Sequence, residues 1–483
     1  MTTKPVIVWF RQDLRLADNP ALTRAGETGR PIVPVFILDD GSRTRRIGAA
    51  SRWWLDKSLR ALDAGLRDRG SRLILRSGDS EGELRRLIEE TGADAVLMNR
   101  LFEPDAFQRD ADIAHALKAE GVECRGFNGS LLCRPGGVLN GSGQPYRVFT
   151  PFLKALLAKA EAPPHTPGPR AITTPRDVAS EAIEDWGLHP SAPDWSPGFD
   201  WTPGETGGAD TLSHFIAEGL PTYATGRDHP ALSGASRLSP HLHWGELHPW
   251  RVVERVRAAA SEGRAPAPEA EKFVAELGWR DFSAQLLHHF PRMPDTAFRR
   301  EYDAMPWRED DQGLAAWRKG LTGYPVVDAG MRQLWTTGWM HNRVRMIVAS
   351  FLVKDLLIDW RRGEAWFWDT LVDADLANNV QNWQWVAGSG ADAQPFFRIF
   401  NPVSQGRRFD ADGDYVRRWV PELANLPSRW IHEPWSAPDD VRRSASVRLG
   451  DNYPSRIVEH SLARDRALEA LKSVSASRYE GND

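Results

Sequence analysis

Four short apolar runs alternate with amphipathic stretches over the first 130 residues. The runs lie at 5–10, 31–39, 72–79 and 95–100, with the sequences PVIVWF, PIVPVFILD, RLILRSGD and AVLMNR. Because these runs are mostly apolar at successive positions, they predict strands that are buried on both faces, as in a parallel sheet. The stretches at 51–69 and 81–91 predict helices between them. This order predicts a doubly wound α/β domain with a parallel sheet.

The pattern changes after the first domain. Residues 161–210 are rich in Pro, Gly and Trp and have little periodicity, which predicts a connection that runs over the surface. From about residue 206 the periodicity is helical, and no strand pair is evident. We expect an α/β domain at 1–135, an interdomain connection at 136–205, a large all-α domain at 206–475 and a short polar tail at 476–483.

The composition is that of an ordinary globular protein, with 41% hydrophobic and 26% charged residues. No apolar run reaches the roughly 18 residues of a membrane span, and the N-terminus becomes charged too early for a secretory signal. Two cysteines, Cys124 and Cys133, exclude a disulfide framework and a four-cysteine cluster. The net charge of -4 neither favours nor excludes nucleic acid, because a local basic face suffices. We expect a cytoplasmic monomer.

The most unusual segment is 371–402, LVDADLANNVQNWQWVAGSGADAQPFFRIFNP. It combines carboxylates, amides and large aromatic rings, although a buried polar group without a partner costs roughly 2–7 kcal/mol. Such a mixture indicates a planar ligand with polar edges. A calcium loop that starts at Asp373 is excluded, because its sixth and twelfth positions are Asn378 and Gln384 instead of Gly and Glu. No GxGxxG follows the first strand, which disfavours a dinucleotide in the usual Rossmann position.

Two other segments carry candidate chemistry. In GASRLSP, Ser239 before Pro240 predicts a helix N-cap, and the free N–H groups of a helix start attract phosphate. Taken alone, this segment is better explained by an ordinary helix cap. In ELGWRDF, helical spacing puts Glu276, Trp279 and Arg280 on one face, either as a solvated ion pair or as the wall of a pocket.

A long apolar helix is predicted over 338–360, which includes HNRVRM. Asn342 and Met346 share a face of this helix by their i, i+4 spacing. A polar amide at the start of a buried helix needs a partner, which is either nearby backbone or a ligand.

Together these segments resemble the photolyase/cryptochrome family, from Val6 to about Ala467. The opening VWFRQDLRLADNPAL and the motifs GASRLS, ELGWRDF, HNRVRM and 371–402 carry the resemblance. It implies FAD bound in the helical domain. The implied contacts are Tyr223, Ala235, Ser236, Arg237, Leu238, Ser239, Glu276, Arg280, Asn342, Arg345, Asp373, Asp375 and Asn379. Ala235 stands where the family has Thr, so one hydroxyl contact is lost, and Arg345 is expected to pair with Asp373.

The resemblance implies light-driven repair of cyclobutane pyrimidine dimers in DNA. HNRVRM is the pattern of this activity, since the branch that repairs (6-4) photoproducts has His where Asn342 stands. Glu276 and Asn342 would hydrogen-bond the flipped-out dimer. The walls of the dimer pocket would be Trp279, Met346 and Trp385. The candidate phosphate contacts are Arg237, Arg343, Arg407 and Arg408.

Three tryptophans match the electron wire of the family: Trp383, Trp360 and Trp307. The chain is most similar to the bacterial class III group, which implies a methenyltetrahydrofolate antenna in the N-terminal domain. Trp53, Trp54 and Glu103 are candidate antenna contacts, although core packing explains the two tryptophans as well, and a flavin-type or deazaflavin antenna is an alternative.

A cryptochrome-type blue-light receptor is the alternative function. Asn379 argues against it, because plant cryptochromes have Asp at this position facing flavin N5, and a neutral amide avoids a second anion beside a reduced anionic flavin. The presence of all the residues expected in the dimer pocket and the lack of a long C-terminal tail also argue against a cryptochrome. A flavin oxidoreductase would need a nicotinamide fingerprint, which the sequence lacks.

Overall fold

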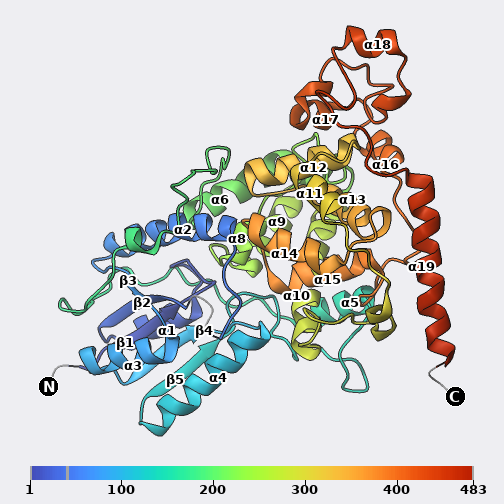
Figure 1. The fold of residues 1–483 in the computed structure, drawn as a ribbon. Coiled ribbons are helices and arrows are strands. Elements are labelled where there is room, and N and C mark those ends of the chain that lie inside the picture. The colour runs from blue at the N-terminus through green and yellow to red at the C-terminus, as the bar shows by residue number, and fades with distance from the viewer. Residues whose placement is uncertain (1–2, 40–42, 481–483) are drawn as a thin grey trace. The chain divides into compact units, whose positions relative to one another are not determined.

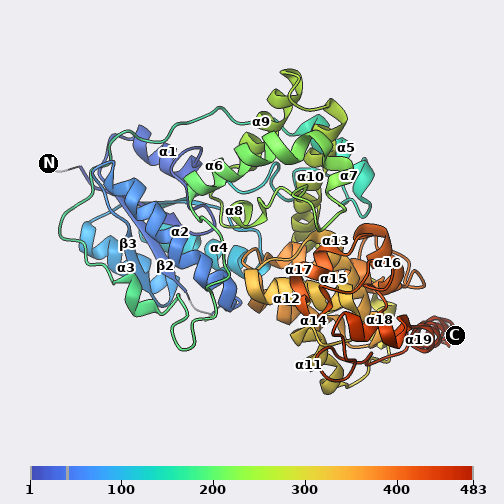
Figure 2. The same ribbon diagram turned by 90° about the horizontal axis from the view of Figure 1, so that it is seen from above.

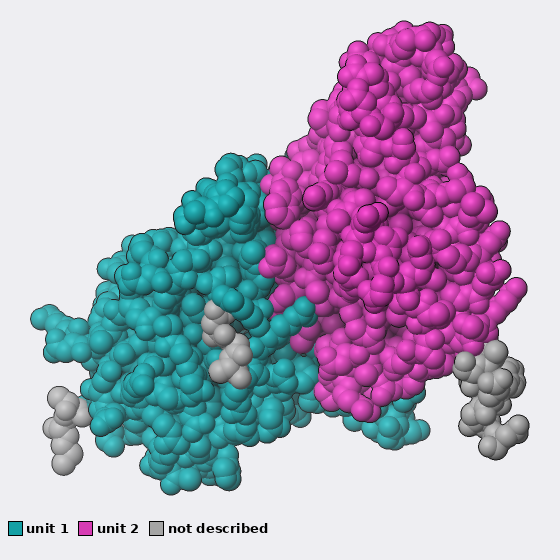
Figure 3. Space-filling view, viewed as in Figure 1, with its two compact units in different colours: residues 1–221, 236–289, 372–375 teal, residues 222–235, 290–371, 376–483 magenta. Residues whose placement is uncertain are grey.

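The structure is a computed structural model that describes residues 3–39 and 43–480. Its contacts divide the chain into two compact units, which are coloured separately in Figure 3. Unit 1 comprises 1–221, 236–289 and 372–375. Unit 2 comprises 222–235, 290–371 and 376–483. Each unit is described by itself.

Unit 1 contains one five-stranded parallel sheet with the order β3-β2-β1-β4-β5 (Figure 1). The strands are β1 (Val6–Phe10), β2 (Ile32–Leu38), β3 (Ile74–Ser77), β4 (Ala95–Asn99) and β5 (Glu123–Phe127). The four strands predicted from apolar runs are confirmed. The sequence did not predict β5, because its residues ECRGF are polar and half exposed, as an edge strand permits.

Helices cover both faces of this sheet. Alternate residues of β1 point to opposite faces. Val6, Val8 and Phe10 pack against α1 (Pro20–Glu27) and α2 (Ala49–Arg67). Ile7 and Trp9 pack against α3 (Ser80–Thr91) and α4 (Pro104–Ala119). The predicted doubly wound α/β domain is therefore confirmed.

Unit 1 also contains helices that follow the sheet in the chain. They are α5 (Phe149–Lys159), α6 (Glu205–His214), α8 (Ser239–His243), α9 (Pro249–Ser261) and α10 (Ala267–His289), with a short π-helix at Phe215–Gly219. Figure 2 shows α9 and α10 side by side, and α10 also packs on α5. The helix α10 carries the ELGWRDF motif.

In the described residues of unit 2 the regular elements are helices, apart from an isolated bridge between Leu449 and Tyr453. Its α-helices are α7 (Tyr223–Gly226), α11 (Asp311–Lys319), α12 (Pro325–Thr337), α13 (Asn342–Ser350), α14 (Trp360–Thr370), α15 (Leu376–Ala387), α16 (Pro402–Phe409), α17 (Asp414–Trp419), α18 (Asp439–Ser444) and α19 (His460–Glu480). The predicted all-α domain is confirmed as a class. In the described part of the chain, no helix has the length and apolarity that a membrane crossing needs.

The predicted single helix over 338–360 is wrong at both ends. Gly338 has a left-handed φ of 67° and ends α12, so α13 begins only at Asn342. After Ser350 the backbone changes to a π-helix, η5 (Phe351–Asp355), and Leu357 has a φ of 55°. The apolar pattern predicted burial correctly, but hydrophobicity does not reveal a cap or a change in hydrogen-bond spacing.

Candidate functional site

The GASRLS segment is held by one carboxylate and a tight turn. Ser239 is the first residue of α8 and Leu238 is its N-cap, so the predicted N-cap role of Ser239 is wrong. The Ser239 hydroxyl instead donates to Asp373 Oδ2 at 2.6 Å. Arg237 has a left-handed φ of 54°, and its guanidinium lies 4.0 Å from the ring centroid of Trp201. Within unit 1 this brings together the predicted contacts Ser239 and Asp373.

Asp375, two residues after Asp373, belongs to a cluster of titratable groups in unit 1. His243 Nδ1 lies 3.5 Å from Asp375 Oδ2. Burial, together with the negative charge of Asp375, raises the pKa of Glu103 to about 7. Glu103 precedes α4, and its Oε1 is buried without a hydrogen-bond partner among the described residues. At neutral pH the Glu103 carboxyl is therefore protonated in a large part of the molecules.

The three residues of ELGWRDF have different surroundings on α10. Glu276 lies 3.7 Å from Lys272 and keeps 26% of its side chain exposed. Arg280 donates to the carbonyl oxygens of Ser130 and Leu242. One face of the Trp279 ring stacks on Phe149, with centroids 3.7 Å apart and planes 8° from parallel. Stacking fixes the Trp279 plane and leaves its other face as the one that a flat ligand could use.

In unit 2, HNRVRM forms a capped helix start. His341 is the N-cap of α13, and its Nδ1 accepts the N–H of Arg343 at 3.2 Å. Burial lowers the pKa of His341 to about 4, so the ring is neutral and can accept this bond. Asn342 follows the cap and is exposed, and Met346, one turn later, is half-buried. The cap therefore places Asn342 and Met346 on the first turns of one rigid helix.

The arginines of this helix already have partners within the protein. Arg343 forms an ion pair with Asp228 at 2.7 Å and lies 4.4 Å from the ring centroid of Phe409. Arg345 donates to the carbonyl of Met340 at 2.8 Å. Its pairing with Asp373 stays a prediction, because the two residues belong to different units.

Asn379 has a fixed amide orientation. Its Nδ2 donates to Glu364 Oε1 at 2.8 Å and to the Glu364 carbonyl at 3.1 Å. Both residues are buried, with 8% and 6% of their surfaces exposed. Because both donors of the amide are used by Glu364, the Oδ1 oxygen is the atom left to accept a hydrogen bond from a ligand.

The Trp-Gln-Trp sequence lies on α15, which packs beside α14. Trp383 is 2% exposed and Trp385 is half-buried, so the two rings face different environments as their spacing predicts. The Trp383 ring passes so close to Gly363 that a Cβ there would lie 2.2 Å from it. Its other ring neighbours are Phe367 and Trp317, at centroid distances of 5.0 and 6.2 Å.

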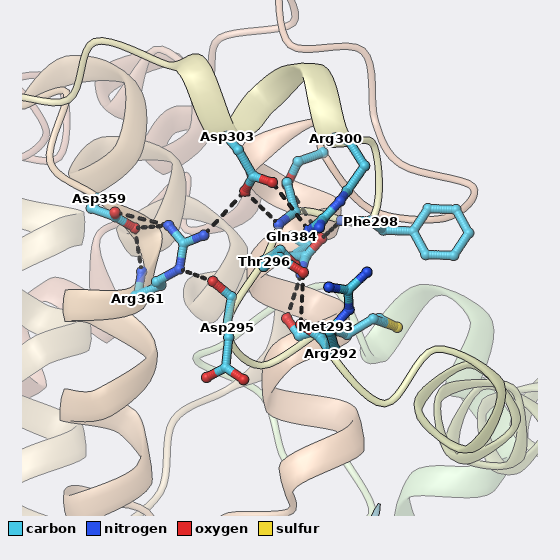
Figure 4. A network of polar contacts seen from close by, with 12 residues as sticks. Arg292, Met293, Asp295, Thr296, Phe298, Arg300, Asp303, Asp359, Arg361 and Gln384 are labelled. Atoms are coloured by element: carbon cyan, nitrogen blue, oxygen red, sulfur yellow. Dashed lines mark hydrogen bonds and ion pairs between the residues drawn. The ribbon is translucent and has the colours of Figure 1, made fainter.

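Gln384, between the two tryptophans, is fully buried and uses its whole amide. Its Nε2 donates to the carbonyls of Met293 and Thr296 at 2.8 and 3.0 Å, and its Oε1 accepts the N–H of Phe298 at 2.7 Å (Figure 4). Gln384 thereby fixes α15, and with it Trp383 and Trp385, against the segment at 293–298.

The same network reaches Trp360. Arg361 bonds Asp359, the Asp295 carbonyl and Asp303 (Figure 4). Its guanidinium lies 4.8 Å from the ring centroid of Trp360, which is 2% exposed. Trp307, the third tryptophan of the expected wire, is half-buried against the cluster that contains Tyr302 and Leu357. The order Trp383, Trp360, Trp307 stays a prediction.

The antenna candidates lie in the core of unit 1. Trp53 is 5% exposed and contacts the edges of Trp54 and Phe199 at 6.4 and 5.1 Å. Trp54 is fully buried, and its Nε1 donates to Glu246 at 2.9 Å. Core packing therefore accounts for both rings, whereas Glu103 keeps an acceptor without a partner.

Comparisons with known proteins place the chain in the photolyase/cryptochrome family. Residues 6–170 match the family described as DNA photolyase, and residues 273–473 match the FAD binding domain of DNA photolyase. Within that family, the chain is 50% identical to a deoxyribodipyrimidine photo-lyase of Agrobacterium fabrum, over 98% of this chain and 99% of the relative. It is 38% identical to Cryptochrome-1 of Arabidopsis thaliana, over 97% of this chain and 70% of that protein.

A solved structure gives the same result. The crystal structure of a bacterial class III photolyase from Agrobacterium tumefaciens matches with a TM-score of 0.96 and 50% identity, and covers 99% of this chain and 98% of that one. The expected family and its FAD-binding domain are therefore confirmed. The individual site residues stay predictions.

The residues present fit FAD by their chemistry. Asp373 and Asp375 are acceptors suited to hydroxyl groups, and the Asn379 Oδ1 is an acceptor at a fixed position. Ser236 and Arg237 offer a hydroxyl and a cation suited to a pyrophosphate.

Sequence reasoning missed several residues that support these groups. They are His341, Glu364, Gln384, Phe149 and Gly363. Only Gln384 had a local sign, namely its position between two tryptophans. His341 acts locally, on the Arg343 N–H two residues away. Glu364, Gly363 and Phe149 act on residues that are distant in the chain, such as Trp279, 130 residues after Phe149.

Proposed function

We propose that this protein repairs cyclobutane pyrimidine dimers in DNA with light, as a deoxyribodipyrimidine photo-lyase. The observation that carries the proposal is the Asn379–Glu364 pair. It keeps a neutral amide, with its oxygen free to accept, at the position where the family faces flavin N5. The two relatives from Agrobacterium support it, because they are named as photolyases and match this chain over nearly its whole length.

When bound, fully reduced FAD supplies the electron that light sends to the dimer and takes it back afterwards. Both carbon–carbon bonds that join the two pyrimidines break, and each base regains its C5=C6 double bond, so there is no net redox change. The chain's own residues bind, orient and stabilise. A protonated Glu276 carboxyl and the Asn342 amide would donate hydrogen bonds to the base carbonyls, where negative charge develops.

The apolar residues of the proposed dimer pocket would exclude water. Trp279 presents one free ring face, because Phe149 covers the other. Met346 and Trp385 are half-buried, which leaves surface for a flipped-out base. Stacking on an aromatic face is worth roughly 1–3 kcal/mol per base and does not depend on sequence. Damage weakens stacking and pairing, so flipping costs less at a dimer than at intact bases.

Candidate DNA contacts follow from exposure and charge. Arg408 is exposed and lies near the Phe409 ring, whereas Arg343 and Arg407 pair with Asp228 and Glu433. DNA phosphates would compete with these carboxylates. Phe397 is 64% exposed, and Arg398 beside it is exposed too. An exposed aromatic ring next to a cation suits an unstacked base and its phosphate, and we add both residues to the proposed DNA surface.

We also propose methenyltetrahydrofolate as a second chromophore in the α/β domain. The unpartnered Glu103 Oε1 could accept hydrogen bonds from the amino group of a pterin. Trp53 is a weaker candidate, because its neighbours already cover it. A different cofactor is possible within the family, since a photolyase from Sulfolobus tokodaii was solved with two FAD molecules. Reconstitution with the folate, compared between wild type and Glu103→Gln, tests the contact.

We further propose a monomer that acts in the cytoplasm. Cys124 and Cys133 are both free thiols, and a reducing compartment keeps them so. Light scattering of the purified protein tests the monomer.

The assay for the main proposal is the loss of dimers from a defined oligonucleotide in blue light and in the dark. A cryptochrome-type receptor is the second candidate, favoured by the 38% identity to Cryptochrome-1. It predicts light-driven reduction of FAD without loss of dimers.

A further inference from the structure

A lysine without solvent exposure lies outside the residues assigned above. Lys354 belongs to the π-helix η5 and is 0% exposed. Its Nζ donates to the carbonyl oxygen of Arg398 at 2.9 Å and lies 5.4 Å from the ring centroid of Phe396. A buried ammonium group is costly unless it is paired and hydrogen-bonded. The partner of this costly group is the backbone of the 394–400 segment.

The 394–400 segment has further attachments, one of them to Ser350 at the end of α13. Gln394 Nε2 also donates to the Arg398 carbonyl, at 2.8 Å. Ser350, one helical turn before Lys354, accepts the N–H of Phe400 at 3.4 Å. Phe396 is 2% exposed and anchors the segment in an apolar cluster of unit 2. Within this segment Pro395, Phe397 and Arg398 are exposed to solvent.

We propose that Lys354 is a positioning residue for DNA binding, which holds the Arg398 carbonyl and thereby presents Phe397 and Arg398 in one fixed conformation. The role of the two exposed residues rests on the proposed function. The clamp itself rests on contacts within unit 2. A binding segment that is already held in one conformation loses less conformational entropy when it binds than a mobile segment does.

The charges around Lys354 agree with a clamp. Burial lowers the pKa of Lys354 to about 7, opposed by Asp355 and reinforced by Arg398. Asp355 is itself paired with His460 Nδ1 at 2.5 Å, and Arg466 donates to the Asp355 carbonyl. His460 of α19 takes up one carboxylate oxygen of Asp355, and the Lys354 ammonium donates to the Arg398 carbonyl. The lysine nitrogen can donate whether it is charged or neutral, but the charged form makes the stronger bond.

The test compares Lys354→Met with Lys354→Gln in the full-length protein loaded with FAD. Met keeps the length and removes the donor, whereas Gln keeps a donor without the charge. Lys319→Met, at an exposed position of α11, is the matched control. Trypsin cleavage after Arg398, followed by mass spectrometry, measures how firmly the 394–400 segment is held. This measurement does not depend on repair activity. Binding of a dimer-containing oligonucleotide reports the DNA surface.

Loss of a charge-assisted hydrogen bond should raise cleavage after Arg398 by about tenfold in Lys354→Met and weaken DNA binding by a similar factor. Lys354→Gln and the control should stay within about threefold of wild type. Phe397→Ala should weaken DNA binding in the wild type and much less in Lys354→Met, because the ring is no longer positioned there. A role confined to overall stability would leave the two substitutions additive.

Unchanged cleavage in Lys354→Met overturns the clamp. Faster cleavage with unchanged DNA binding would mean that Lys354 holds the 394–400 segment but has no role in DNA binding. If Lys354→Met does not fold, Gln394→Met replaces it, since Lys354 then holds the carbonyl alone. Cleavage after Arg398, relative to a control peptide, should rise as the pH passes about 7, where the ammonium of Lys354 loses its charge. A ratio that does not change with pH contradicts the proposal.

Discussion

Asn379 donates both of its amide hydrogens to Glu364, one to the side chain and one to the backbone carbonyl. The two residues are 15 positions apart, on helices α15 and α14. A flipped amide would place two oxygens against each other, so the pair permits only one orientation. The Asn379 amide, at the position expected to face flavin N5, is therefore fixed by a buried partner and not only by residue type.

This pair predicts the effect of Asn379→Asp. A carboxylate there adds an anion beside a reduced anionic flavin and beside Glu364. Repulsion between these negative charges disfavours the reduced form of the flavin. The two-electron reduction potential of bound FAD should fall by on the order of 50 mV. Asn382→Asp, which adds the same charge at an exposed position of α15, should leave the potential nearly unchanged. Equal shifts in the two variants would refute a specific role of position 379.

Glu276 is predicted to act on the reaction more than on binding. Glu276→Ala should lower the quantum yield of repair by about threefold or more, because its hydrogen bond strengthens as charge develops on the dimer. Affinity for dimer-containing DNA should change less. Lys272→Ala is the matched control, since it removes only the 3.7 Å ion pair of Glu276. A loss confined to affinity in Glu276→Ala contradicts the assigned role.

Trp383 is predicted to be the first relay in the reduction of oxidised FAD by light. Trp383→Phe should slow this photoreduction by about tenfold or more, because Phe is much harder to oxidise, while repair by pre-reduced protein stays near wild type. Trp430→Phe, a half-buried tryptophan elsewhere in unit 2, serves as control. Photoreduction at the wild-type rate in Trp383→Phe would mean that another of the 21 tryptophans carries the electron.

His341 predicts a dependence of stability on pH. Its folded-state pKa of about 4 lies below the ordinary value of about 6.5, so its contribution is complete above pH 6.5 and is lost as the pH falls through 4. Protonation removes the acceptor that caps α13. In His341→Asn, which keeps a capping acceptor that does not titrate, this part of the pH dependence should disappear. His341→Ala should lose about 1 kcal/mol at neutral pH. Thermal unfolding from pH 4 to 8 measures both.

The sequence predicted the parts of the fold whose signal is local. β1 and β2 are apolar throughout and β4 is apolar up to its last residue, Asn99, so their runs reveal them, whereas the edge strand β5 is too polar for that. The break before Asn342 and the π-turn after Ser350 depend on a cap and on packing, which periodicity does not encode. Family motifs supplied Asn379 and Trp279, but not their supports Glu364 and Phe149, because those contacts form only when distant helices pack together.

The most direct test of the central claim is repair by the purified, reduced protein of two oligonucleotides, one with a cyclobutane dimer and one with a (6-4) photoproduct. The account predicts that blue light restores the cyclobutane dimer to two intact pyrimidines, that darkness does not, and that the (6-4) photoproduct remains, because Asn342 stands where that activity has His. Loss of the (6-4) photoproduct at an equal rate would contradict the assignment of Asn342. An unchanged cyclobutane dimer under light that fully excites the reduced FAD would contradict repair altogether.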